Sequence, residues 1–308
     1  MKILNILCSL VLMFSLAALG TYNYHRYTTM SDEGPVIMMD SDTIEVSVKD
    51  DPSVLLEGVM AYDKEDGDVT SSLGISSISE FIDQECSVRM VNYVAFDEDA
   101  HVAKASRKLV YSDYKTIHFS LDEPLRFPMQ STNVNLLSIL HARDCIDGDI
   151  SKQISFSEDS VIEVDTASDY NVVLQASNSA GEIKELPVTI RIYDNTKEIG
   201  LPQIELTDYM VYTKVGEKID PRDYITGVYY GGEEYLVTYG QGTFGIDTYD
   251  YTREEKMEFA RLTPTVSIDR FYFDDGVDYN TPGVYEIKYM IETLSAQKGT
   301  AYQIVIVE

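Results

Sequence analysis

The segment Ala61-Tyr-Asp-Lys-Glu-Asp-Gly-Asp-Val-Thr70 returns later in the chain as Ala142-Arg-Asp-Cys-Ile-Asp-Gly-Asp-Ile-Ser151, at an offset of 81 residues. The same offset places the apolar segment 91–96 over the segment 172–177. Self-similarity at a fixed period is the signature of tandem structural units. The sequence therefore predicts duplicated modules of about 80 residues each.

Outside the repeated turn, each module has the pattern of β-structure. Thr43–Val48, Ser87–Ala95 and Leu186–Tyr193 alternate apolar and polar residues, as half-buried strands do. Asp-Gly, Asn-Ser and Ala-Gly dipeptides between such segments are turn signals. Several short strands separated by turns within one module are typical of an antiparallel β-sandwich.

A third, longer module follows the two copies. It begins near Pro202 and closes with Thr281–Met290 and Ala301–Glu308, a turn followed by two alternating strands. Extra residues from about 227 to 276 interrupt this module, and Arg253–Arg261 within them has the pattern of a short helix. We therefore expect an insert in the third module.

An apolar segment precedes the modules. Residues 3–20 carry no charge, Lys2 lies before them, and Ala18-Leu19-Gly20 would serve as a small-residue cleavage site. A helix of this length measures roughly 27 Å, enough to cross the hydrocarbon core of a bilayer. Residues 1–30 are predicted to be either a cleaved signal peptide or a retained N-terminal membrane anchor. Both alternatives place the rest of the chain outside the cytoplasm.

The composition excludes several classes of partner. Acidic residues outnumber Lys and Arg by 52 to 24, and the formal net charge is -28. Nucleic acids are excluded because their affinity comes mainly from Lys and Arg that neutralise phosphates, and docking on anionic lipid is disfavoured for the same reason. The three cysteines are too few for a disulfide scaffold. Cys86 and Cys145 are predicted to be thiols of separate modules.

The repeated Asp-x-x-Asp-Gly-Asp-[Val/Ile]-[Thr/Ser] motif, together with the Asn178-Ser-Ala-Gly181 hairpin, resembles the bacterial surface-protein immunoglobulin-like domain. Hyalin-repeat and cadherin-like domains are similar in style. The resemblance covers the first two modules well and the third weakly, and Asp97–His101 departs from the Asn-Gly type of hairpin of the family. It implies an all-β fold of tandem immunoglobulin-like antiparallel β-sandwiches and a role as an extracellular spacer, stalk or adhesive module, without implying an activity.

The predicted organisation is a leader followed by three domains. Residues 1–30 form the signal peptide or anchor, 31–114 the first immunoglobulin-like domain, 115–199 the second, and 200–308 the third with its insert at about 227–276. The apolar residues predicted to lie in the sandwich cores are Val59, Val91, Val94, Leu140, Val173, Ile190, Ile192, Tyr285 and Ile304.

The aspartates of the repeated turns have two interpretations. In an immunoglobulin-type sandwich the turns approach the hairpin loop at the same end, and oxygen ligands that converge at a module junction are what calcium requires. In the structural alternative, which we favour, Asp caps a turn in which Gly supplies a positive φ. The spacing also differs from that of an EF-hand. The candidate calcium ligands are Asp63, Asp66, Asp68, Asp113, Asp144, Asp147 and Asp149.

The third module is rich in tyrosine and glycine, a combination that forms broad, adaptable contact surfaces. In the alternative interpretation, these tyrosines form cross-strand pairs, because Tyr favours strands. A recognition face on this domain would use Tyr229, Tyr230, Tyr235, Tyr239, Tyr249 and Tyr251.

The motifs of catalysis are absent from the sequence. The four histidines form no His-x-x-x-His arrangement, and the chain has no Gly-x-Ser-x-Gly elbow and no phosphate-binding glycine loop. The sequence predicts a non-enzymatic extracellular surface protein without a cofactor, calcium being the alternative. It would contact the membrane only through its N-terminal segment and bind a protein or glycan at the cell surface through the third domain.

Two other functions stay open. One is a secreted carbohydrate-binding or hydrolytic protein that works through the third module. The other is a structural subunit of an envelope assembly that docks through an unpaired edge strand.

Overall fold

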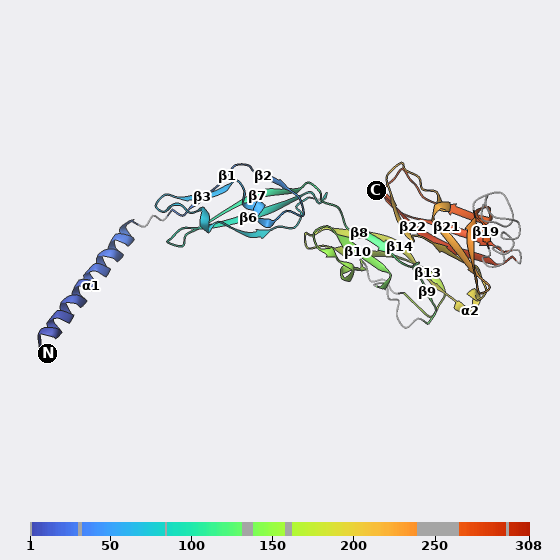
Figure 1. The fold of residues 1–308 in the computed structure, drawn as a ribbon, viewed down its shortest axis with the longest axis horizontal. Coiled ribbons are helices and arrows are strands. Elements are labelled where there is room, and N and C mark those ends of the chain that lie inside the picture. Colours follow the sequence, from blue (N-terminus) through green and yellow to red (C-terminus); the bar gives the residue numbers. More distant parts are fainter. Residues whose placement is uncertain are drawn as a thin grey trace, which may run out of the picture. The chain divides into compact units, whose positions relative to one another are not determined.

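The computed structural model describes residues 2–29, 33–83, 85–130, 138–157, 162–238, 265–293 and 296–308. The chain divides into two compact units, Met1–Tyr114 and Lys115–Glu308. Strands make up most of the regular structure in both units (Figure 1). The chain is therefore all-β apart from short helical segments and its N-terminal helix.

The apolar N-terminal segment forms α1 (Lys2–Thr29), a helix of 28 residues. The apolar side chains described on it, such as Leu10, Phe14 and Leu19, are exposed. Among the residues whose side chains are described, no helix is long and apolar enough to be assigned as a membrane span. Whether this segment is a cleaved signal peptide or a retained anchor stays a prediction.

The described strands of the first unit form two facing sheets. One sheet has the strand order β1-β3-β4, and the other has the order β2-β7-β6-β5. Side chains of both sheets meet in a core that includes Val59, Val91, Tyr93 and Leu109. The strands are β1 (Val36–Met39), β2 (Thr43–Val46), β3 (Val59–Asp63), β4 (Gly67–Asp68), β5 (Gly74–Ile78), β6 (Val88–Phe96) and β7 (Val102–Tyr111).

The second unit repeats this arrangement once in full and once with an extra strand in the smaller sheet. Its sheets β8-β10-β11 and β9-β14-β13-β12 match the two sheets of the first unit in strand order, and β16-β22-β21-β20 matches the four-stranded sheet once more, facing β15-β17-β18-β19. The short helix α2 (Asn195–Glu198) lies between the two sets of strands. The strands are β8 (His118–Leu121), β9 (Arg126–Pro128), β10 (Leu140–Asp144), β11 (Gly148–Asp149), β12 (Ser155–Phe156), β13 (Ser168–Ser177), β14 (Ile183–Tyr193), β15 (Gln203–Leu206), β16 (Met210–Thr213), β17 (Ile225–Tyr230), β18 (Glu233–Thr238), β19 (Thr265–Ser267), β20 (Phe271–Asp275), β21 (Gly283–Glu292) and β22 (Lys298–Val307).

The two copies of the repeated segment have matching structures. Strands β3 and β10 begin and end 81 positions apart, and each is followed by a two-residue strand and a 3-10 turn. Gly67 and Gly148, which open those two-residue strands, have φ values of 75° and 76°. Glycine stands at both positions because it adopts this left-handed conformation without a steric penalty.

The sandwiches are not wholly antiparallel, which corrects the predicted fold. In three of the four-stranded sheets the edge strand β2, β9 or β16 runs parallel to β7, β14 or β22, and in the sheet β15-β17-β18-β19 the edge strand β19 runs parallel to β18. In the first unit the chain leaves β1 at Asp40, whose N–H donates to the carbonyl of Gly58 at 3.0 Å, and crosses directly to the other sheet. Because the chain does not reverse between β1 and β2, the crossing strand meets the last strand of the other sheet in parallel.

The predicted core residues Val94, Val173 and Tyr285 are only half-buried. Along β6 the buried side chains alternate, and Tyr93 is buried, so Val94 lies on the opposite face. On β13 the same alternation buries Leu174 and leaves Val173 on the opposite face. The other six are buried as predicted: Val59, Val91, Leu140, Ile190, Ile192 and Ile304.

The two sandwiches of the second unit share part of their hydrophobic core. Met210 and Ile304, which belong to the third set of sheets, lie in the same cluster of buried side chains as Phe119, Leu140 and Ile190. A second cluster fills the interior of the last sandwich. The second unit is therefore one compact body that contains two sandwiches. The predicted domain boundary at residues 199 and 200, inside this unit, stays a prediction.

Candidate functional site

Asp63 and Asp144 organise the two repeated turns. One carboxylate oxygen of Asp63 accepts hydrogen bonds from the N–H groups of Glu65 and Asp66 at 2.7 and 3.0 Å. Asp144 accepts the two equivalent bonds, both at 2.9 Å. The bond from the Asp66 N–H is the main cause that lowers the pKa of Asp63 below its ordinary value. The first aspartate of the motif is thus an acceptor for the backbone of its own turn.

The second aspartate of the motif ties the turn to the neighbouring hairpin. Asp66 accepts a hydrogen bond from the N–H of Glu98 at 2.8 Å. Asp147 accepts bonds from the N–H and the hydroxyl of Ser179 at 2.5 and 2.6 Å. The turn and the hairpin therefore meet at the same end of each sandwich, as expected for an immunoglobulin-type arrangement.

The third aspartate caps the 3-10 turn that follows the motif. Asp68 accepts a hydrogen bond from the N–H of Thr70 at 2.9 Å. Asp149 accepts bonds from the N–H and the hydroxyl of Ser151 at 3.0 and 2.6 Å. Hydrogen bonds from the Thr70 and Ser151 side chains are the main causes that lower the pKa of the two aspartates. The hydrogen bond to the third aspartate therefore explains why the motif ends in Thr or Ser.

Asp113 completes the set of predicted calcium ligands. It accepts hydrogen bonds from the N–H of Val48 at 2.8 Å and from the hydroxyl of Ser47 at 2.7 Å, and the Val48 bond lowers its pKa most. Within the described residues, no group of three or more His, Cys, Asp or Glu side chains is arranged to hold a metal ion. The hydrogen bonds favour the structural interpretation of the seven aspartates, and calcium binding stays a prediction.

Three of the predicted recognition tyrosines lie on the hairpin of β17 and β18. The hydroxyl of Tyr230 donates to the side-chain oxygen of Gln297 at 2.5 Å, and its ring centre lies 6.5 Å from that of Tyr235. Both rings pack against the core of the last sandwich. Tyr229 differs, because 45% of it is exposed. The other three, Tyr239, Tyr249 and Tyr251, lie outside the described residues.

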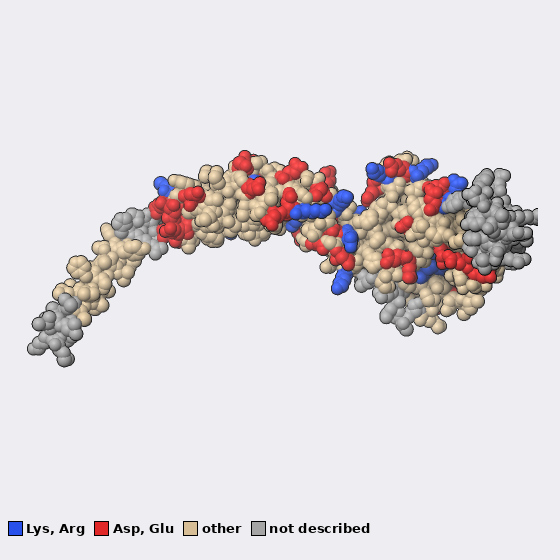
Figure 2. All heavy atoms as spheres, in the orientation of Figure 1, with Lys and Arg blue, Asp and Glu red and all other residues tan. Residues whose placement is uncertain are grey.

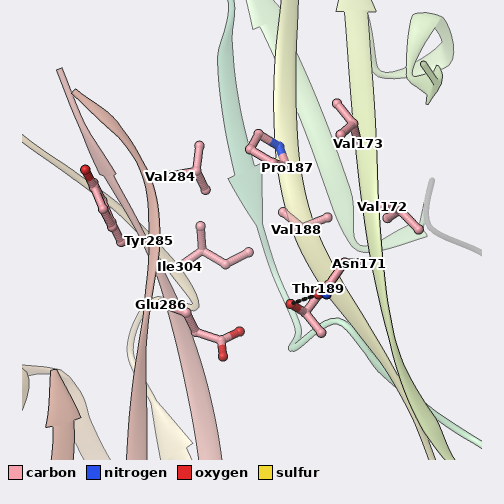
Figure 3. Close-up of a pocket in the computed structure, with 10 residues that line it drawn as sticks. All are labelled: Asn171, Val172, Val173, Pro187, Val188, Thr189, Val284, Tyr285, Glu286 and Ile304. Atoms are coloured by element: carbon pink, nitrogen blue, oxygen red, sulfur yellow. Dashed lines mark hydrogen bonds between the residues drawn. The ribbon is translucent and has the colours of Figure 1, made fainter. Parts of the chain in front are cut away.

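A groove of about 310 Å³ lies within the second unit, between strands of its two sandwiches (Figure 3). One wall is formed by β13 and β14 and the other by β21 and β22. Val284 and Ile304 point across the groove toward Pro187 and Val188 (Figure 3), so its centre is apolar. This groove could not be predicted from sequence patterns, because its two walls come from distant parts of the chain.

An ion pair joins the two walls beside the groove. The guanidinium of Arg191, on β14, donates two hydrogen bonds to the carboxylate of Glu286, on β21, at 2.8 and 2.6 Å. The guanidinium carbon also lies 3.5 Å from the ring centre of Tyr302. Bidentate pairs of this kind fix relative orientation as well as adding energy. The pair therefore holds the two sandwiches in one arrangement.

A second contact joins β8 to β16. The hydroxyl of Tyr212 accepts a hydrogen bond from the N–H of Phe119 at 2.8 Å, and its ring stacks on that of His118 with centres 4.0 Å apart. Burial lowers the pKa of His118 and raises the pKa of Tyr212 to about 12. Both side chains therefore favour their neutral forms at neutral pH.

No protein-family model and no curated protein matches the chain. Among solved structures, CBM51-2 in complex with GlcNAc and INT domains from Clostridium perfringens ZmpB matches at 14% identity and a TM-score of 0.20, over 51% of this chain and 41% of that chain. The extracellular domain of protocadherin GammaB4 matches at 13% identity and a TM-score of 0.18, over 90% and 49% of the two chains. Domains 6-7 of surface layer protein SbsC match at 13% identity and a TM-score of 0.20, over 51% and 97%.

This chain spans less than half the length of the first two of these structures. The TM-scores are too low for the similarities to bear on function. The functional proposal below therefore rests on the features of the chain itself.

Proposed function

We propose that this chain is an exported, non-enzymatic surface protein whose tandem immunoglobulin-like sandwiches space and present a recognition surface outside the cell. The observation that carries the proposal is the recurrence of one four-stranded sheet order in three consecutive sandwiches. The connection between the first two sets is short, since β7 ends at Tyr111 and β8 begins at His118. Such a repeated sandwich fold does not by itself imply an activity.

The charge of the surface supports this role. Acidic side chains are spread over the face of both units that Figure 2 shows, and basic side chains are fewer there. A net charge of -28 keeps a protein soluble and makes its copies repel one another at long range. These properties suit a module that stands in solvent at a crowded surface.

The roles of the acidic side chains support a function without catalysis. The aspartates of the repeated motif hold turns and loops together, and Asp63 and Asp144 are also buried. For Asp63 these backbone hydrogen bonds lower the pKa, so this side chain is stabilised as the carboxylate and is a poor proton donor. These groups therefore serve the fold rather than acid–base chemistry.

Protease accessibility on intact cells tests the proposed location. With an epitope tag placed after Glu308, external protease should remove the tag from intact cells while a cytoplasmic marker stays whole. The matched control carries Leu12→Arg and Phe14→Arg, which place charges in the apolar leader and should leave the tag protected. A wild-type tag that is cleaved only after lysis would refute export.

A second candidate function, glycan recognition by the last sandwich, rests on Tyr229. This residue is exposed on the β17–β18 hairpin, two residues before Gly231, whereas Tyr230 is held by Gln297. The test is binding of the full chain to an array of glycans, with Tyr229→Ala as the variant and Tyr272→Ala, another exposed tyrosine, as the control. Binding that survives Tyr229→Ala, or no binding by the wild type, would reject this candidate.

A further inference from the structure

The hairpin loop of the first sandwich contains a partly buried ion pair. In this loop, which joins β6 to β7, the Nδ1 atom of His101 lies 2.7 Å from one carboxylate oxygen of Asp97. The other oxygen of Asp97 accepts a hydrogen bond from the N–H of His101 at 2.7 Å. The Asp97 side chain is 4% exposed and the His101 side chain 36%. An opposite charge at this distance favours the protonated ring, and little water screens the carboxylate.

The equivalent loop of the second sandwich makes the same backbone contact without a histidine. Asn178 and Glu182 stand 81 positions after Asp97 and His101. The side-chain oxygen of Asn178 accepts the N–H of Glu182 at 3.0 Å, and its amide group donates to the buried Asp144 at 3.1 Å. In the second sandwich, a neutral amide that does not titrate therefore joins the loop to the first aspartate of the repeated turn.

The same place in the first sandwich holds a second carboxylate. Asp97 replaces the asparagine and, when ionised, has no hydrogen to donate to Asp63, the equivalent of Asp144. Asp63 is buried. Its pKa is lowered mainly by the hydrogen bond from the N–H of Asp66, and the charge of His101 adds to the lowering. The charge of the His101 ring therefore acts on both aspartates.

Three segments meet at His101, and most of their charged residues are acidic. The repeated turn is tied to the loop by the bond from the Glu98 N–H to Asp66 at 2.8 Å. The segment before β1 packs closely, since a Cβ on Gly34 would lie 3.0 Å from the Cβ of His101. Lys64 is the one base on these segments, and it lies 3.9 Å from Glu33. Besides Asp97 and Asp63, the acids they carry are Glu33, Glu65, Asp66, Asp68, Glu98 and Asp99.

We propose that this ion pair makes the contact between the hairpin loop and the repeated turn of the first sandwich pH-sensitive. The protonated ring of His101 offsets the charges of Asp97 and Asp63 in mild acid, and the contact loosens when the ring loses its proton. Carboxylates ordinarily ionise at about pH 4 and imidazole at about pH 6.5, so the ring is the group that changes charge between about pH 6 and 8. Because the folded state favours the protonated ring, this stabilisation is complete below about pH 6.5 and is lost as the pH rises.

The second unit responds in the opposite direction. Burial lowers the pKa of His118, so the folded second unit favours the neutral ring and loses stability in mild acid. A change of pH through the range in which histidine titrates therefore shifts the stability of the two units in opposite directions.

Titration of the histidine rings tests the ion pair directly. In the full chain in mild detergent, with 13C-labelled histidine, the ring signal of His101 is identified by its loss in His101→Gln. We expect the midpoint of this titration to lie about one pH unit higher in the wild type than in Asp97→Asn. The control is Asp122→Asn, which removes the partner of His141 from an exposed pair and should shift the His141 signal less. Equal His101 midpoints in the wild type and Asp97→Asn overturn the proposal.

Hydrogen exchange tests the contact itself. Peptides that cover residues 97–101 report the opening of the loop by mass spectrometry, after correction for the intrinsic effect of pH on exchange. From pH 6 to 8 we expect wild-type protection to fall by about three- to tenfold, since one pH unit corresponds to tenfold in the opening equilibrium. Asp97→Asn with His101→Glu gives this loop the residues of the second sandwich and should remove the change.

Thermal melting checks that the double variant is folded. If it is not, the His101 titration in the wild type and Asp97→Asn decides. Wild-type protection that stays constant between pH 6 and 8, or a folded double variant whose protection changes as much as that of the wild type, overturns the proposal.

Discussion

Asp144 shows why the first residue of the repeated motif is an aspartate. Its side chain is buried, and its carboxylate accepts two backbone N–H groups of its own turn and a third hydrogen bond from the Asn178 amide at 3.1 Å. Buried donors without an acceptor are costly. The geometry of the turn therefore explains why a short side chain with an acceptor oxygen stands at this position. No ligand is needed to explain it.

Replacing Asp144 by Ala should destabilise the second unit. The substitution removes the carboxylate that accepts three hydrogen bonds. We therefore expect the free energy of unfolding to fall by about 1–3 kcal/mol. Urea denaturation measures the change. Glu185→Ala, at an exposed position of β14, should change stability by no more than about 0.5 kcal/mol. Equal stability of the two variants would show that these bonds do not support the turn.

Calcium should leave the thermal unfolding of the chain unchanged. The seven candidate ligands all accept hydrogen bonds from the protein, and within the described residues no three or more His, Cys, Asp or Glu side chains are arranged to hold a metal ion. The measurement is the melting temperature with calcium at about 1–10 mM, the range in which weak extracellular sites fill. A rise in melting temperature that Asp147→Asn removes would instead establish the calcium site.

At the scale of the strands, the alternation pattern located β6 and β14 correctly, and the 81-residue offset located the repeated turn. Some core positions were misassigned, because a period of two allows Val91 or Val94 on the core face of β6 but not both. The parallel pairing of β2 with β7 could not be predicted, since a four-residue strand shows which face is buried and not which strand it joins. Pairing depends on where the chain crosses, and only three residues separate β1 from β2.

The contact between β8 and β16 should make the second unit less stable in mild acid. Burial lowers the pKa of His118 below its ordinary value of 6.5, while Glu308 acts in the opposite direction and Lys184 adds to the lowering. The unfolded chain therefore takes up the proton first, and stability falls as the pH drops from about 6.5 through the folded pKa.

The pH effect should disappear when His118 no longer titrates. His118→Phe keeps a flat ring against Tyr212 and removes the proton site. Melting temperatures of the second unit between about pH 7.5 and 5 should decline less for the variant than for the wild type. Parallel curves for the two proteins would assign the decline to other groups.

At the scale of the whole molecule, the repeat predicted two matching modules and the strand pattern predicted a third, but neither predicted how the last two associate. Arg191 and Glu286 are 95 residues apart, and no local pattern marks either one as a partner. The same limit applies to the candidate sites. The motif aspartates were visible because they recur, whereas Val188 and Ile304 became walls of one groove only once the two sandwiches of the second unit were placed together.

The shared core predicts how the whole chain unfolds. Because Met210 and Ile304 lie in one buried cluster with Phe119 and Ile190, the two sandwiches of the second unit should melt in a single calorimetric transition, separate from that of the first unit. Glu286→Ala leaves the guanidinium of Arg191 without its bidentate partner. Since both side chains keep some contact with water, the expected loss is about 1–2 kcal/mol.

For a unit of this size, that loss lowers the transition of the second unit by about 2–8 °C. The transition of the first unit should stay in place, because Glu286 belongs to the second unit. Glu234→Ala, at an exposed position of β18, serves as the control. Two separate transitions from the second unit of the wild type would mean that its sandwiches are independent modules, and that the contacts of Arg191 and Tyr212 do not couple them.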